Sequence, residues 1–132
     1  MNCSYPIYDF CLWRGEDKEL FLSFSYTEQD GTTTSMKLDN CRFEMLLTVQ
    51  NSQKVVDSLT SESGRLVPGI LEDGVFSASD INATVLQVLF PHETTAQLWA
   101  VNIVYELFKI DPADKREMLL AGTIDVHGGG YV

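Results

Sequence analysis

The sequence predicts an all-β protein built as an antiparallel β-sandwich. Three observations predict this class. Apolar residues recur at every second position over most of the chain, turn-forming residues separate these runs, and only one short segment carries a helix start signal. A chain of 132 residues with 45% hydrophobic residues can bury one core without disulfides. We therefore expect one domain over residues 1–126, followed by a flexible glycine-rich tail at 127–132.

The first two expected strands flank a polar turn. The segment 8–12 alternates between large apolar and smaller or polar side chains, and the polar run 14–19 ends it. The segment 20–26 alternates in the same way, up to a second turn at 28–31 that contains glycine. These patterns predict strands whose alternate residues face a core.

The clearest half-buried strand is expected at 42–49. Phe43, Met45 and Leu47 alternate there with more polar residues, so one face is apolar and the other mostly polar. The following stretch 50–80 is rich in Ser, Gly, Asp and Glu. It predicts irregular connections with short strands, one of them at Val55 and Val56.

The segment 84–90 is apolar on both faces, which is typical of a strand that is covered on both sides or that lies at a subunit contact. The segment 91–98 follows it. Pro91 at the first helical position and Glu93 in the first turn predict one or two turns of helix there.

The C-terminal part predicts a central strand and a hairpin. An alternating stripe runs from Trp99 to Leu107, and another runs over 120–126. The segment 111–122 between them also fits a helix, because Asp and Pro begin it and Gly ends it. Its apolar part is contiguous and short, so we favour a hairpin with 111–115 as the loop. The whole pattern predicts an Ig-like β-sandwich of about seven strands with one short helical turn.

Charge argues against some partners. Nine basic and nineteen acidic residues give a formal net charge of −10, which is unsuited to a nucleic-acid backbone. No window approaches the roughly 18 apolar residues of a membrane span, and the start lacks the pattern of a signal peptide. We expect a soluble protein that binds neither nucleic acid nor membrane.

The three cysteines, Cys3, Cys11 and Cys41, cannot all pair within the chain, which fits a reducing compartment. Cys11 and Cys41 lie in apolar runs, and we expect them to act as small hydrophobic residues.

No catalytic signature is present. The chain has no nucleophile elbow, phosphate loop or CysXXCys pair, and His92 lacks the second histidine of a zincin helix, so we expect a turn residue. Glu72, Asp73 and Asp80 do not follow the spacing of a calcium loop. The sequence therefore predicts a protein that is not an enzyme and needs no cofactor or metal.

Five aromatic residues could stack on a sugar, namely Trp13, Phe21, Tyr26, Trp99 and Tyr105. Alternation instead assigns most of them to the core. Trp13 and Phe21 are the exceptions, because they oppose the main apolar stripes of their strands.

In the strands expected at 20–26 and 84–90, apolar side chains also lie on the face opposite the core. Such side chains suggest contact with a partner subunit. The candidates for protein contact are Trp13, Phe21, Leu46, Val104 and Phe108. We expect association with other proteins, including further copies of this chain.

Four motifs carry a resemblance to a known family. They are the turn and strand at 14–26, the leucine-containing strand entry at 38–47, the Pro/Glu-Thr turn at 91–98 and the Asp-Pro hairpin with its return strand at 105–126. Together the motifs resemble small β-sandwich structural proteins of tailed bacteriophages, similar to the N-terminal domains of baseplate and tail-fibre attachment proteins. The stretch 50–80 and the end of the chain depart from that pattern.

The resemblance implies a non-enzymatic virion protein, made in the cytoplasm of the bacterial host and located in the phage tail. It would act as an adaptor that attaches fibres or joins ring subunits, with other tail, fibre or head-tail proteins as partners and a homo-oligomer on the particle. A capsid decoration protein is one alternative. A carbohydrate-binding module for host attachment is another, and it would require Trp13 and Phe21 to be exposed and coplanar.

Overall fold

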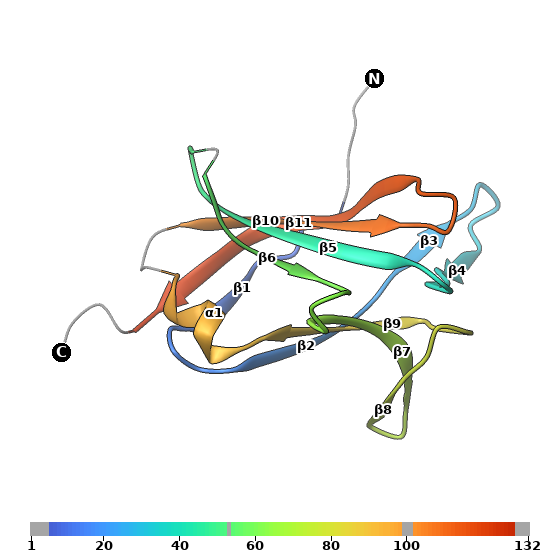
Figure 1. Cartoon of the computed structure of the whole chain (residues 1–132). Helices are drawn as coiled ribbons and strands as arrows, with labels where there is room; N and C mark the ends of the chain where they lie inside the picture. The colour runs from blue at the N-terminus through green and yellow to red at the C-terminus, as the bar shows by residue number, and fades with distance from the viewer. Residues whose placement is uncertain (1–5, 53, 99–101, 129–132) are drawn as a thin grey trace.

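The protein is a sandwich of two main β-sheets (Figure 1). The computed structural model describes residues 6–52, 54–98 and 102–128. One sheet has five strands in the order β1-β11-β10-β5-β6, the other has four in the order β2-β9-β7-β8, and β3 and β4 form a separate hairpin. The elements are β1 (Phe10–Trp13), β2 (Lys18–Ser23), β3 (Ser25–Thr27), β4 (Thr33–Ser35), β5 (Arg42–Val49), β6 (Val55–Thr60), β7 (Leu66–Glu72), β8 (Val75–Ala78), β9 (Val85–Phe90), α1 (His92–Ala96), β10 (Ile103–Ile110) and β11 (Arg116–His127).

The predicted fold class is confirmed: the structure is an all-β, Ig-like sandwich, and α1 is the one helix among the described residues. Two details differ from the prediction. The described chain forms eleven strands rather than about seven, and β1 pairs with β11 in parallel, with Phe10 opposite Ile124. Alternation reveals which face a residue occupies but not which strand lies beside it, so it could not show this parallel pair.

The core lies between the two sheets and follows the period of two. Phe43, Met45 and Leu47 of β5 are buried from one side, and Leu86 and Val88 of β9 are buried from the other. Consecutive inward positions on each strand therefore supply the apolar contact that holds the layers together.

The predicted strand at 20–26 is interrupted at Phe24, so its two halves belong to different sheets. Lys18–Ser23 pairs with β9, whereas Ser25–Thr27 pairs only with β4. Tyr26 therefore lies outside the core with 48% of its surface exposed, and its predicted core position was wrong.

The two described cysteines, Cys11 and Cys41, differ in how far they are exposed. Cys41 packs against the core as predicted, and burial raises the pKa of its thiol. Cys11 is exposed, because Leu12 beside it on β1 takes the buried position. Cys11 therefore does not pack as the small hydrophobic residue that its apolar run predicted, and Cys3 lies outside the described residues.

The stretch 50–80 holds three strands, β6, β7 and β8, in place of mainly irregular chain. Strand β7 occupies the middle of this stretch, between β9 and β8. Its Pro68 and Gly69 are residues that normally mark turns, so they concealed a strand in the sequence.

The hairpin at 111–115 is confirmed. The Asp111 N–H donates to the Lys115 carbonyl, and the Asp114 N–H donates to the Asp111 carbonyl. The register of β10 on β11 shifts after Leu107, so Leu119 and Leu120 are both buried at a β-bulge. The last strand ends at His127, one residue into the expected tail.

Candidate protein interface

The outer face of the four-stranded sheet carries a pair of aromatic rings. Phe21 of β2 is 41% exposed, and its ring centroid lies 5.5 Å from that of Phe76 on β8. The two strands are at opposite edges of the sheet, so the two side chains must together span β9 and β7 to make this contact.

Gly69 on β7 makes the crossing possible. A Cβ built at Gly69 would lie 2.6 Å from the nearest ring atom of Phe76. Because glycine has no side chain there, the Phe76 ring lies over the β7 backbone and extends toward Phe21. Any side chain at this position would displace the ring.

Further apolar side chains surround the two rings. Leu86, Val88 and Phe90 of β9 point into the core, so the alternate residues of β9 face outward. Leu71 on β7 is 41% exposed. The aromatic face, as we call this surface, consists of Phe21, Val67, Leu71, Phe76, Val85 and Leu89. The polar Gln87 lies among them, opposite Phe21 and Val67, and its side-chain amide donates a hydrogen bond to the Glu19 carboxylate at 2.8 Å. A sheet face in contact with water is normally polar, so the apolar side chains around Phe21 are of the kind that a protein interface buries.

The outer face of the five-stranded sheet is also partly apolar, but charged side chains lie over some of its apolar residues. Leu46, Val104 and Phe108 all lie on it, and each is half-buried. The Arg116 guanidinium lies 3.9 Å from the centre of the Phe108 ring, and it pairs with Glu44 at 2.8 Å. This face brings three predicted contact residues together, but charged side chains of the same chain cover part of it.

Trp13 lies apart from the other candidates. It is 57% exposed on the edge strand β1, and its ring centroid is 5.4 Å from that of His127. Phe21 lies on the other sheet with Phe76 as its ring neighbour. The structure therefore does not bring Trp13 and Phe21 together as one sugar platform, and Trp99 lies outside the described residues.

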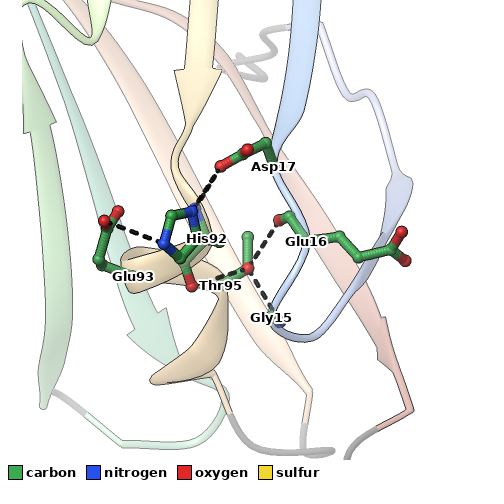
Figure 2. Close-up of polar contacts among 6 residues, drawn as sticks. All are labelled: Gly15, Glu16, Asp17, His92, Glu93 and Thr95. Atoms are coloured by element: carbon green, nitrogen blue, oxygen red, sulfur yellow. Dashed lines mark hydrogen bonds and ion pairs between the residues drawn. The ribbon is translucent and has the colours of Figure 1, made fainter.

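A polar cluster joins the β1–β2 turn to α1 (Figure 2). The buried Thr95 hydroxyl accepts a hydrogen bond from the Gly15 N–H at 3.0 Å and donates to the Glu16 carbonyl at 2.8 Å. Arg14 donates from Nε to the Ala96 carbonyl at 3.0 Å. The turn thereby fixes the position of the helix.

Asp17 serves as the cap of this helix. Pro91 at the N-cap makes no side-chain hydrogen bond, and the Asp17 carboxylate accepts the His92 N–H at 2.7 Å instead. This hydrogen bond from the His92 backbone lowers the pKa of Asp17. The His92 ring lies between Asp17 and Glu93, 3.1 Å from each carboxylate.

The cluster has the contacts of a structural joint. Its hydrogen bonds join backbone and side chains of the same chain, and His92, Asp17 and Glu93 are all exposed. His92 is the first residue of α1 rather than a turn residue. Within residues 6–52, 54–98 and 102–128, no three His, Cys, Asp or Glu side chains gather as a metal site would require, and no helix is long and apolar enough to cross a membrane.

Sequence reasoning found Phe21 but missed Phe76 and Gly69, which complete the aromatic face. A signal was present, because 66–71 is apolar at consecutive positions in the same way as 84–90. Polar residues on both sides of 66–71 concealed its similarity to the strand at 84–90.

Comparisons with known proteins concern the fold alone. No family model and no curated protein matches the chain. Among solved structures, the chain is similar to murine CRIg, with 10% sequence identity over 91% of this chain and 92% of that chain, at a TM-score of 0.36.

Proposed function

We propose that this protein is a non-enzymatic structural protein of a tailed-phage virion, working as a tail adaptor that attaches fibres or baseplate components through protein contacts. The observation that carries the proposal is the aromatic face, in which Phe21 and Phe76 meet across Gly69. The resemblance of four sequence motifs to those of baseplate and fibre-attachment domains supports the phage assignment.

The chemistry of the aromatic face favours a protein partner. Burial of apolar surface contributes roughly 25 cal/mol per Å², and aromatic side chains supply most of the energy at many interfaces. The same face repeated around a symmetric particle adds its weak contacts together. A small surface on each copy is therefore sufficient for attachment.

The charge of the chain is compatible with assembly on the particle. A formal net charge of −10 keeps free copies apart in the host cytoplasm, where the protein would be made. On the virion, contacts with other tail proteins would overcome this repulsion and arrange several copies as a homo-oligomer.

The proposal is tested by size-exclusion chromatography with light scattering on the purified protein, alone and mixed with the virion proteins encoded beside it. We expect a ring-sized oligomer or a stable complex, and we expect Phe21→Ser to abolish it. Tyr26→Ser is the matched control, because Tyr26 is an aromatic residue of similar exposure that lies outside the aromatic face. A monomer that binds none of these proteins would contradict the proposal.

A second candidate is a carbohydrate-binding module for host attachment in which Trp13 acts without Phe21, since Trp13 is exposed but lies on the other sheet. An exposed indole ring can stack on the apolar face of a sugar. Glycan-array binding that is lost in Trp13→Ala and kept in Phe21→Ser would favour this function over the adaptor.

A further inference from the structure

Strand β8 is an outer strand of the four-stranded sheet, and one of its backbone edges is free among the described residues. It pairs with β7 across a two-residue turn in which Asp73 and Gly74 both have positive φ, at 51° and 79°. Figure 1 shows this hairpin extending away from the rest of the sandwich. The strand nearest in the sequence to each segment outside the described residues belongs to the five-stranded sheet, so none of these segments continues β8 in the chain.

The hydrogen bonds between β7 and β8 show which backbone groups face the free edge. The Ser79 N–H donates to the Pro68 carbonyl at 3.0 Å. Because hydrogen-bonded and non-hydrogen-bonded pairs alternate along an antiparallel ladder, the pairs that Phe76 and Ala78 make with β7 are non-hydrogen-bonded. The N–H and C=O groups of Phe76 and Ala78 therefore point away from β7. This free edge offers two donors and two acceptors.

The edge of β8 lacks the usual protection against pairing. Sheet edges are commonly protected by charged residues, proline or a bulge. Strand β2 carries Lys18 and Glu19, and β6 carries Asp57 and a register shift against β5. Strand β1 is uncharged but lies between Asp9 and Arg14. Strand β8 has no charge, proline or register shift, and it lies between a glycine and a serine.

A second copy of the same strand fits this edge. Two β8 strands placed antiparallel about a two-fold axis at Ser77 match each outward N–H of Phe76 and Ala78 with a C=O of the other copy. The same register places each Phe76 side chain opposite the small Ala78 side chain of the other copy, on one face of the sheet. An axis at Phe76 would instead leave Ala78 opposite the turn at Gly74. The axis at Ser77 therefore uses the whole edge.

Charge sets the strength of this contact. Glu72, Asp73 and Asp80 lie close to β8 in the chain, and each copy has a formal net charge of −10. Two copies therefore repel each other, and their pairing becomes stronger as salt screens the repulsion. A basic strand of another protein would show the opposite dependence, because salt would weaken its attraction to this edge.

We infer that β8 is a contact between copies of this chain, in which two β8 edges pair antiparallel about an axis at Ser77. The two four-stranded sheets then form one continuous sheet, whose outer side carries both aromatic faces. The contact rests on the proposed function for its place on a virion, where neighbouring copies are held at high local concentration. It can be measured on the purified chain alone.

Disulfide trapping of Ser77→Cys tests the pairing. The full chain carries Cys3→Ser and Cys11→Ser as well, and the same chain with Ser77 intact shows the background from Cys41. Opposed residues of a non-hydrogen-bonded pair have Cα atoms about 4.5 Å apart, which is within the reach of a disulfide. After mild oxidation we expect a disulfide-linked dimer on a non-reducing gel. Its yield should rise at least about fivefold between roughly 0.02 and 0.5 M NaCl.

Ala78→Cys in the same background is the matched control for the register. Ala78 is exposed on the same strand as Ser77. The two positions 78 are offset by two residues along the strands, more than about 7 Å apart, so the dimer yield should be at least about fivefold lower.

Ala78→Pro, added to Ser77→Cys, removes an N–H at the free edge that the β7 ladder does not use. It should abolish the crosslink while urea unfolding by circular dichroism shows a folded chain.

Several results would overturn the inference. These are no dimer above the background from Cys41, equal yields from Ser77→Cys and Ala78→Cys, a crosslink that persists in folded Ala78→Pro, or a yield that falls as salt rises. A position-77 crosslink in a chain that binds no virion protein would support this contact and contradict the proposed function. A virion complex whose copies never crosslink at position 77 would contradict this contact alone.

Discussion

Removing the Thr95 hydroxyl tests how the β1–β2 turn is held on the sandwich. Thr95→Val keeps the volume and β-branching of the side chain but deletes both the acceptor for Gly15 and the donor to Glu16 (Figure 2). Thr95 itself is fully buried, so no water enters its place without displacing α1. The two backbone groups on the turn lose their partner together.

The expected cost follows from the number of hydrogen bonds. Each lost hydrogen bond reduces stability by about 1 kcal/mol, so the loss of two predicts about 2 kcal/mol. Gly15 and Glu16 are exposed residues, and water replaces part of the loss. For a chain of this length the change lowers the melting temperature by about 6 to 8 °C.

The assay is urea unfolding followed by circular dichroism, with Thr94→Val as the matched control. Thr94 is also buried in α1, but its hydroxyl makes no hydrogen bond to any described residue. The control should change the free energy of unfolding by less than about 0.5 kcal/mol. Equal stability of the two variants would refute the account of this joint.

Three further predictions concern the N-terminal segment and its contact with β10 and β11. Tyr105→Phe removes the hydrogen bond from the Tyr105 hydroxyl to the Tyr8 carbonyl and should cost about 1 to 2 kcal/mol in urea unfolding; an unchanged midpoint would contradict this. Burial raises the pKa of Tyr105, so above its ordinary value of 10.0 the unfolded chain loses a proton that the folded chain keeps. Stability should therefore fall as pH rises above about 10, and this slope should be smaller in Tyr105→Phe. Gly122→Ala places a Cβ against the Tyr8 carbonyl oxygen, so we expect a loss of about 1 to 3 kcal/mol and faster proteolysis before Phe10. Wild-type cleavage rates would contradict the contact.

The sequence predicted the parts of the fold in which one face is apolar and the other polar. Strand β5 is the clearest case, because Phe43, Met45 and Leu47 are all buried as their alternation indicates. The hairpin loop at 111–115 was also predicted correctly. The parallel pairing of β1 with β11 was not, since it depends on contacts between residues more than 100 positions apart.

The candidate interface was only partly predictable for a related reason. Phe21 could be found because it opposes the apolar stripe of its own strand. Its neighbour Phe76 comes from a hairpin across the sheet, and the contact depends on the missing side chain of Gly69. Leu46, Val104 and Phe108 do share a face, but the salt bridge and ring contact of Arg116 that cover part of it arise only from the tertiary register.

Site-specific photo-crosslinking is the most direct test of whether the aromatic face binds another virion protein. Benzoylphenylalanine replaces Phe21 in one sample and Tyr26 in a control sample, and each protein is irradiated in the presence of the virion proteins encoded beside it. We expect a crosslink from position 21 to a tail, fibre or baseplate protein and little crosslinking from position 26. Crosslinks to a head protein, or no crosslink from position 21 above the control, would show that the aromatic face is not the tail interface.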